Sequence, residues 1–131
     1  MPELFKKILT SRVYEAAIET PLDEANELSK RYGNRILLKR EDQQPVFSFK
    51  IRGAYNKIAH LDEQDLNKGV FAASAGYHAQ GVAFAAIKLS IRAVIVMPET
   101  TPKIKIDAVK SYVGEVVLAG NNYSEAAAHA E

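Results

Sequence analysis

The sequence has no cysteine, which excludes a disulfide scaffold, a thiolate nucleophile and a cysteine-ligated metal ion. Its histidines, His60, His78 and His129, lie far apart in the chain, so their spacing gives no reason to expect a zinc site. The formal net charge is only +1, and this balance argues against nucleic acid or an anionic membrane as a partner. No apolar run approaches the length that spans a bilayer, and the first residues lack the apolar core of a signal peptide. These absences predict a soluble, cytoplasmic protein without a metal site.

Hydrophobic residues make up 47% of the 131 residues, which is enough to build the core of one domain. Apolar periodicity along the chain alternates between the helical and the extended kind. Helices are predicted over residues 3–13, 22–32, 48–61, 78–89 and 102–112, with a last one from Ser124. Strands are predicted over residues 35–40, 70–74, 92–97 and 115–119. The recurrence of strand, helix and strand is typical of βαβ units, so the fold class is α/β, with a parallel sheet flanked by helices.

Several of these helices have recognisable boundaries. The second helix follows Pro21 and ends at Gly33, a residue type that favours a helix stop. Thr101 is the expected cap of the helix that follows it, Gly114 is the expected stop of that helix, and Ser124 is the expected cap of the last one. The last helix has only about two turns before the sequence ends, and a helix so short is marginal. Two interpretations fit, a frayed tail or the N-terminal part of a longer protein, and we favour the second.

The segment SAGYHAQG, residues 74–81, follows a predicted strand and begins a predicted helix. In parallel α/β sheets this edge is where ligands bind, and the free amides of a helix N-terminus attract an anion. The spacing fits neither G-x-G-x-x-G nor a P-loop, because Val82 and Ala83 replace the lysine and the hydroxyl residue that a P-loop needs. A carboxylate or a single phosphate is therefore favoured over a nucleotide. An equally good interpretation of Gly76 and Gly81 is a tight turn with close helix packing.

Lys50 lies between Phe49 and Ile51 at the start of a predicted helix, beside the apolar stripe of that helix. The simplest interpretation is a lysine whose stem covers apolar surface while its ammonium reaches water, and periodicity alone favours it. The alternative interpretation is that Lys50 is a reactive residue. A helix N-terminus and apolar surroundings both disfavour the ammonium form, and a neutral amine is a nucleophile suited to a Schiff base with a carbonyl. Arg52, further along the same helix, is interpreted as a packing and salt-bridge residue without a chemical role.

Two polar side chains accompany the glycine loop. His78 begins the helix, whose N-terminus disfavours a charged imidazole, so we expect a neutral histidine in contact with a ligand or with backbone. Ser74 is either a hydroxyl ligand or a cap, and no histidine–carboxylate spacing beside it indicates a serine nucleophile. His60 and His129 are expected at the surface.

Two blocks of sequence, KREDQQPVFSFKIRGAYNKI (39–58) and ASAGYHAQGVAFAA (73–86), resemble the signature blocks of the threonine ammonia-lyases, also called threonine dehydratases or deaminases. Segments 11–22 and 95–120 are similar to the same family in the same register, so the resemblance covers nearly the whole chain. SFKIRGA resembles the dehydratase and serine-racemase branch, and the longer KREDQQPVFSFK favours the biosynthetic threonine enzymes. The family belongs to the tryptophan-synthase-β-like (fold type II) enzymes, which use pyridoxal 5'-phosphate.

The resemblance implies a role for individual residues. Lys50 would form the Schiff base with the cofactor and later move protons at the substrate α-carbon, while Phe49 would pack against the pyridine ring. The loop residues that would receive the substrate carboxylate are Ser74, Ala75, Gly76 and His78. Tyr77 stands where the family has an asparagine that hydrogen-bonds the phenolic oxygen of the cofactor. A phenol is larger than that amide and would crowd the ring.

The implied activity is deamination of L-threonine to 2-oxobutanoate and ammonia in isoleucine biosynthesis, with L-serine as a candidate second substrate. The implied partners are the amino-acid substrate and further copies of the chain in a homo-oligomer. The family continues well beyond this sequence, with a glycine-rich loop that cradles the cofactor phosphate. By the same resemblance, residues 1–52 belong to the large cofactor domain, and residues 53–131 form a small α/β domain that is incomplete at its C-terminus. Two alternatives stay open, a non-catalytic fragment or engineered subdomain of this fold, and a small anion-binding α/β module.

Overall fold

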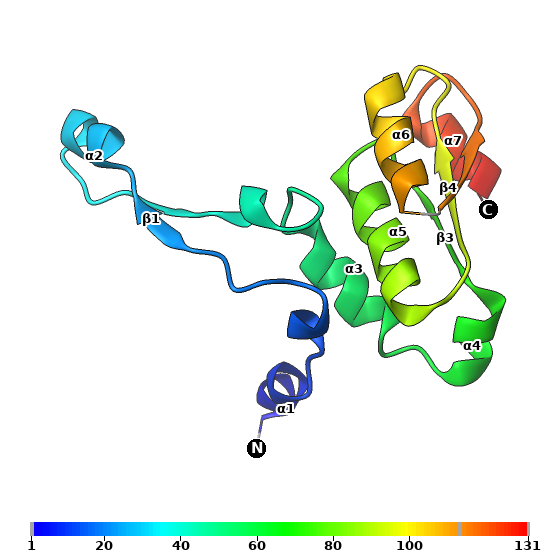
Figure 1. Ribbon diagram of the computed structural model, residues 1–131, viewed down its shortest axis with the longest axis horizontal. Helices are drawn as coiled ribbons and strands as arrows, with labels where there is room; N and C mark the ends of the chain where they lie inside the picture. Colours follow the sequence, from blue (N-terminus) through cyan, green and yellow to red (C-terminus); the bar gives the residue numbers. More distant parts are fainter. Residues whose placement is uncertain (1, 113, 131) are drawn as a thin grey trace.

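Figure 1 shows a computed structural model of the protein, which describes residues 2–112 and 114–130. The chain forms a body around a parallel sheet and a slender arm that projects from this body. The helices, with short 3-10 helices marked η, are α1 (Glu3–Leu9), η1 (Val13–Glu15), α2 (Asn26–Tyr32), η2 (Glu41–Gln43), α3 (Lys50–Ile58), α4 (Glu63–Lys68), α5 (Tyr77–Leu89), α6 (Lys103–Ser111) and α7 (Tyr123–Ala130). The strands are β1 (Leu22–Glu24), β2 (Leu37–Lys39), β3 (Val70–Ala73), β4 (Ala93–Met97) and β5 (Glu115–Leu118). None of the helices in the described ranges is long and apolar enough to cross a membrane.

The body is built on three parallel strands in the order β3-β4-β5. In the register of the sheet, Val70 of β3 pairs with Ala93 of β4, and Val94 of β4 pairs with Glu115 of β5. The central strand β4 is buried along nearly its whole length, which agrees with its run of β-branched and apolar residues. α5 connects the first two strands and α6 connects the last two. The predicted βαβ units, parallel sheet and α/β fold class are confirmed.

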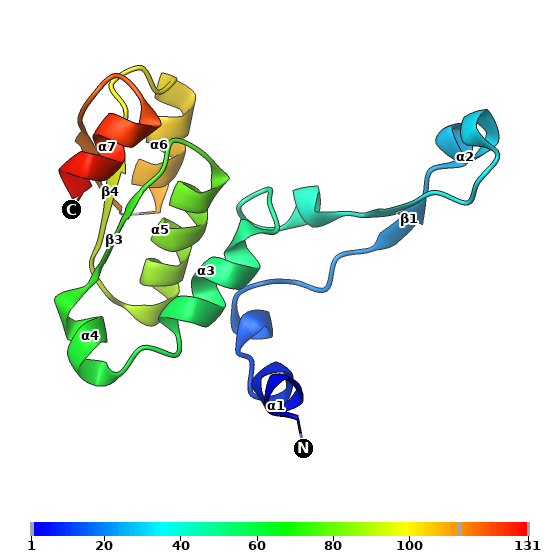
Figure 2. The ribbon, with the colours of Figure 1, turned by 180° about the vertical axis from the view of Figure 1, so that it is seen from behind.

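Helices cover both faces of this sheet, as the opposite views in Figures 1 and 2 show. α5 and α6 pack on one face, α7 packs on the other, and α3 packs against the outer side of α5. The fully buried side chains include Ile95 and Met97 from β4 and Ile51 from α3. Burial of an aliphatic side chain of this size stabilises a fold by about 1.5–3 kcal/mol. The core therefore extends from the sheet through α5 to the first turn of α3.

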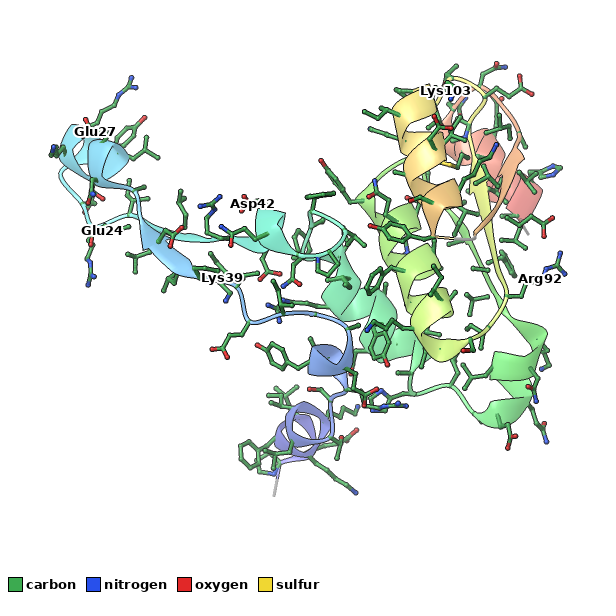
Figure 3. All side chains as sticks on the ribbon, in the orientation of Figure 1. Glu24, Glu27, Lys39, Asp42, Arg92 and Lys103 are labelled. Carbon is green, nitrogen blue, oxygen red and sulfur yellow. The ribbon has the colours of Figure 1, made fainter. Side chains whose placement is uncertain are left out.

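The arm, residues 21–40, contains the antiparallel pair β1 and β2, with α2 at its tip (Figure 1). Charged side chains such as Glu24, Glu27 and Lys39 stand along it in Figure 3. Large apolar side chains are also exposed on the arm, and they are Leu22, Leu28, Tyr32, Leu37 and Leu38. A two-stranded pair that lacks a packed face is marginal by itself. The predicted division at residue 52 stays a prediction.

The N-terminal half contains the main differences from the predicted elements. Residues 22–24 form β1 instead of the first turn of a helix, because pairing with β2 overrides their local helical pattern. α2 does end as predicted, since Gly33 adopts φ 61°, the left-handed conformation that favours glycine. The predicted helix over residues 3–13 divides into α1 and η1. α4 was not predicted, since its short polar sequence has no apolar period, and Asp62 caps it by accepting a 2.8 Å hydrogen bond from the Asp65 N–H.

Three predicted helix boundaries in the C-terminal half are wrong. Pro102, not Thr101, precedes the first residue of α6, and the buried Thr101 hydroxyl has no hydrogen-bond partner among the described residues. α6 ends at Ser111, so Gly114 lies beyond the stop of this helix and packs closely against side chains of α5 and α6. Asn122, not Ser124, caps α7, because its Oδ1 atom accepts a 3.0 Å hydrogen bond from a backbone N–H of the first turn.

Candidate functional site

The two candidate segments of the sequence meet where α3 packs against α5. Gly81 of α5 faces the backbone of Lys50, the first residue of α3. A Cβ atom at Gly81 would lie 3.3 Å from the C and O atoms of Lys50 and 3.4 Å from the Cβ atom of Ala54. Glycine therefore permits this close approach, which confirms the packing interpretation for Gly81. Gly76 lies in the bend between β3 and α5, and its φ of −135° and ψ of −153° are an extended backbone that other residues also adopt, so this bend does not require a glycine.

Lys50 lies in the first turn of its helix, as predicted, and its side chain is exposed. The buried Ser48 accepts a hydrogen bond of 3.3 Å from the Lys50 backbone N–H. The ammonium lies 5.1 Å from the centroid of the Phe49 ring, within the range of a cation–π contact. The described residues do not bury this ammonium, so the apolar surroundings expected from the sequence are only partly present. An exposed amine at a fixed helix terminus remains open to a ligand.

A hollow of about 320 Å³ brings this lysine together with the histidine of the glycine loop. Its lining residues are Phe49, Lys50, Arg52, Gly53, Ala54 and His78. Partial burial of the imidazole, and then the positive charge of Lys50, lower the pKa of His78 below its ordinary value of 6.5. The residue is exposed overall, so the burial of the imidazole is only partial. The direction of the shift is the one predicted for a neutral imidazole, which can donate or accept a hydrogen bond at a ligand.

The hydroxyl of Ser74 holds the turn that leads from β3 into α5. Ser74 is buried, and its Oγ atom accepts hydrogen bonds from the N–H groups of Gly76 at 3.3 Å and Ala79 at 3.2 Å. Of the two interpretations of this serine, the structure supports the cap. Tyr77 and His78 are the first residues of α5, and N–H groups at the start of a helix have no acceptor one turn earlier within that helix. These two N–H groups are the donors on which the anion hypothesis depends.

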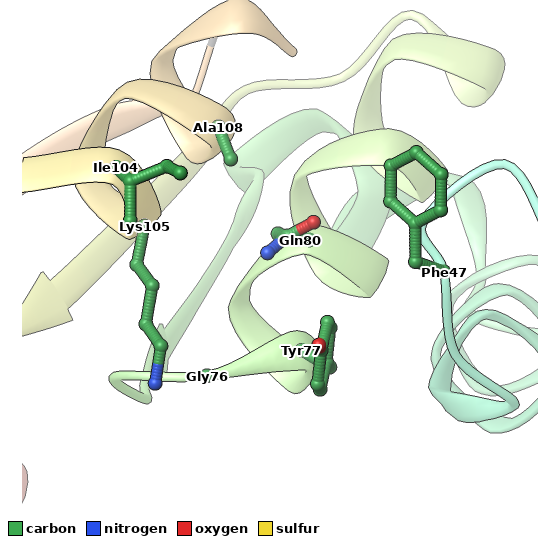
Figure 4. A pocket seen from close by; sticks show the side chains of 7 residues that line it. All are labelled: Phe47, Gly76, Tyr77, Gln80, Ile104, Lys105 and Ala108. Carbon is green, nitrogen blue, oxygen red and sulfur yellow. The ribbon is translucent and has the colours of Figure 1, made fainter. Parts of the chain in front are cut away.

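Gly76 and Tyr77 line a second hollow, of about 310 Å³, which Figure 4 shows from close by. The other lining residues are Phe47, Gln80, Ile104, Lys105 and Ala108. Tyr77 is 54% exposed. Phe47 was missed by the sequence analysis; it is 67% exposed and adopts φ 54°, a conformation that costs a residue other than glycine about 1–2 kcal/mol. Only its place in the block VFSFK could have indicated it.

The structure therefore divides the predicted site residues. Lys50, Phe49 and His78 line the first hollow, whereas Gly76 and Tyr77 line the second. The other two histidines of the chain are exposed, as predicted. Within residues 2–112 and 114–130, no group of three or more histidine, cysteine, aspartate or glutamate side chains could hold a metal ion.

The salt-bridge interpretation of Arg52 is confirmed, and its partner is a residue that the sequence analysis missed. The guanidinium of Arg52 donates to both carboxylate oxygens of Glu41, at 2.8 Å from Nε and 2.8 Å from Nη2. The guanidinium of Arg52 also lies over the Tyr14 ring, with its central carbon 5.3 Å from the ring centroid. Glu41 is 11 positions earlier in the sequence than Arg52, so no helical spacing connects the two residues.

Comparison with known proteins identifies relatives of nearly the whole chain. Residues 13–131 match the family described as pyridoxal-phosphate dependent enzyme. A biosynthetic L-threonine dehydratase of Burkholderia multivorans is 57% identical over 131 residues, which are 98% of this chain and 26% of the relative. A biosynthetic, chloroplastic threonine dehydratase of Arabidopsis thaliana is 57% identical over 129 residues, which are 98% of this chain and 22% of the relative. This chain thus spans about a quarter of the length of these curated relatives.

The structure has a close counterpart among solved structures. The processed form of threonine deaminase isoform 2 from Solanum lycopersicum superposes with a TM-score of 0.91 and 55% sequence identity. The match covers 97% of this chain and 38% of that protein. The projecting arm and the parallel-sheet body therefore recur together in a solved relative.

Proposed function

Because the chain belongs to the pyridoxal-phosphate dependent enzymes, we propose that it is the part of a biosynthetic threonine dehydratase that carries the cofactor-binding lysine. The observation that carries the proposal is the exposed amine of Lys50 at the first turn of α3, packed against α5 beside the glycine loop. The reaction is the deamination of L-threonine to 2-oxobutanoate and ammonia in isoleucine biosynthesis, with L-serine as a second substrate. The enzyme acts in the cytoplasm as a homo-oligomer.

The residues around Lys50 fit this cofactor. The amine is accessible, the Phe49 ring lies beside it, and the lowered pKa of His78 limits positive charge close to the ammonium. Bound pyridoxal phosphate supplies an electron sink that stabilises negative charge at the substrate α-carbon. Lys50 holds the cofactor through its amine and moves a proton at the α-carbon. The N–H groups of Tyr77 and His78 orient the substrate carboxylate at the N-terminus of α5.

The first test is reductive trapping of the cofactor on the full-length protein, followed by peptide mapping and by an assay for the keto acid. We expect borohydride to fix the cofactor on Lys50, and Lys50→Gln to lose both the label and the formation of 2-oxobutanoate. The matched control is Lys57→Gln, because Lys57 is an exposed lysine on the same helix and should retain both. Labelling spread evenly over many lysines would contradict the proposal.

A second measurement separates the alternatives. A small anion-binding module would not develop the visible absorbance of lysine-bound pyridoxal phosphate. Residues 1–131 alone should react weakly at Lys50 and form no useful amount of 2-oxobutanoate. The glycine-rich phosphate loop expected from the family lies outside this segment, and misplacement of a cofactor by about 1 Å can cost about a hundred-fold in rate. Robust turnover by this segment alone would show that it contains every anchor that the cofactor needs.

A further inference from the structure

Glu41 lies at the centre of a polar cluster that joins three separate parts of the chain. Its Oε1 atom accepts hydrogen bonds from Thr20 Oγ1 at 2.6 Å and from Arg52 Nη2 at 2.8 Å. Its Oε2 atom accepts one from Arg52 Nε at 2.8 Å, and the amide of Gln44 lies 3.3 and 3.4 Å from the two oxygens. The carboxylate thus joins the segment before the arm, the segment after it and the first turn of α3.

The cluster is shielded from water. Thr20 is 3% exposed and Gln44 is 1% exposed, while the Glu41 and Arg52 side chains are 16% and 24% exposed. Gln44 also bonds both backbone groups of Ile18, accepting from its N–H at 3.0 Å and donating to its carbonyl at 2.8 Å. Hydrogen bonds to a charged group in such a setting are shorter and stronger than those between neutral groups, and a forked pair with arginine also fixes direction.

The position of Arg52 is unexpected for a residue that serves stability alone. Arg52 and Lys50 both lie in the first turn of α3, and positive charge at a helix N-terminus opposes the helix dipole. The Glu41 carboxylate offsets this unfavourable charge. Hydrogen bonds to the carboxylate, first from Arg52 and then from Thr20 and Gln44, lower the pKa of Glu41 to about 2, so the carboxylate stays ionised at any pH at which an enzyme of this kind works.

Resting on the proposed function, we infer that Glu41 and Arg52 are positioning residues that hold the first turn of α3, so that Lys50 presents its amine to the cofactor in one orientation. α5 fixes the same turn from another direction, because Gly81 packs on the Lys50 backbone. The turn is thereby held by a side-chain pair and by direct helix packing. Neither Glu41 nor Arg52 needs to touch the substrate.

The test compares Arg52→Lys with Arg40→Lys in the full-length protein loaded with pyridoxal phosphate. Arg40 forms the same kind of forked pair with Asp42, at 2.9 and 2.7 Å, and also contacts Asp23 of the arm. Each substitution keeps the positive charge and removes the fork. Arg52→Lys should lower kcat for threonine about ten- to a hundred-fold and change KM less, because displacement of a reacting group by about 1 Å costs about a hundred-fold in rate. Arg40→Lys should change kcat less than about two-fold, since exposed pairs of this kind contribute little.

Two further readouts separate positioning from general stability. The absorption spectrum of the bound cofactor, and the rate at which borohydride fixes it on Lys50, should change in Arg52→Lys and in Glu41→Gln but not in Arg40→Lys. Glu41→Asp keeps the carboxylate and should recover part of kcat relative to Glu41→Gln. If Arg52→Lys lowers only the melting temperature, and its spectrum, trapping rate and kcat match the wild type, the inference is wrong. A wild-type protein that neither binds the cofactor nor forms 2-oxobutanoate would overturn the proposed function instead, and this inference with it.

Discussion

Replacing Gly81 with alanine tests the contact that joins the two halves of the candidate site. The new Cβ atom would lie 3.3 Å from the C and O atoms of Lys50 and 3.4 Å from the Cβ atom of Ala54. Carbon atoms in good contact lie about 3.5–4.0 Å apart, so α3 has to move outward by a few tenths of an ångström. Overpacking of this kind costs about 1–3 kcal/mol. Removing a glycine from a helix interior returns about 1 kcal/mol, so the net effect is a loss of up to about 2 kcal/mol.

Gly53→Ala is the matched control for Gly81→Ala. Gly53 lies within α3, and a Cβ atom there would meet nothing within 4 Å among the described residues. Both substitutions gain the same helix propensity, but only the one at Gly81 creates a clash. Gly53→Ala should therefore stabilise the protein by up to about 1 kcal/mol, which leaves a difference of about 1–3 kcal/mol between the two variants.

The free energy of unfolding of each full-length variant is measured by urea denaturation without cofactor. The difference between the variants isolates the contact with Lys50, because the propensity effect cancels. If Gly81→Ala is as stable as Gly53→Ala, α3 and α5 do not approach as closely as the structure indicates. Packing against Gly81 would then not be what holds the backbone of Lys50.

Three other predictions concern the charge and shape of the site. Tyr77→Asn in the full-length protein should bind pyridoxal phosphate about ten- to a hundred-fold more tightly, because the asparagine regains a hydrogen bond worth roughly 1.5–3 kcal/mol. Titration with the cofactor measures the two affinities. Equal affinities would mean that the phenol points away from the cofactor. Glu41 has a pKa lowered from 4.5 to about 2, so its pair with Arg52 contributes stability above about pH 4.5 that is lost as the pH falls towards 2. At about 1.4 kcal/mol per pKa unit, the loss in free energy of unfolding reaches at most about 3 kcal/mol. Glu41→Gln has no carboxylate to protonate, so its stability should not show this loss as the pH falls. The imidazole of His78 should titrate by NMR below its ordinary 6.5, and Lys50→Gln should raise that midpoint; an unchanged midpoint would leave burial as the sole cause.

The body of the fold could be predicted from the sequence because its signals are local. The three runs rich in β-branched residues became β3, β4 and β5, and the helices between them follow from their apolar periodicity. The arm could not be predicted in the same way. Residues 22–24 pair with a strand about 15 residues further along the chain. Pairing between such distant segments leaves no pattern in the local sequence. α4 was missed because a short helix stabilised by a cap on a polar segment has no apolar face to detect.

The residues of the candidate site also differ in whether the local sequence indicates them. Lys50 and the loop before α5 were found because their residue types are unusual at helix N-termini and because they lie in recognisable blocks. Glu41 was missed because its importance depends on a partner from another element. The two interpretations of Gly81 could be separated only when the position of α3 was known, since a glycine that permits packing looks in the sequence like one that permits a turn.

The arm described above has a consequence for hydrogen exchange. β1 and β2 have only three residues each, and no further strand among the described residues protects their outer edges. Amide protons in such a ribbon open at little energetic cost, so they should exchange with deuterium far sooner than those of β4, which is buried between two strands. The exchange rate of the amide protons of Leu37 and Leu38, which are 40% and 44% exposed, then becomes a reporter of contacts made by the arm. Any protein surface that covers the arm will slow it, and the same measurement gives the free energy of that contact.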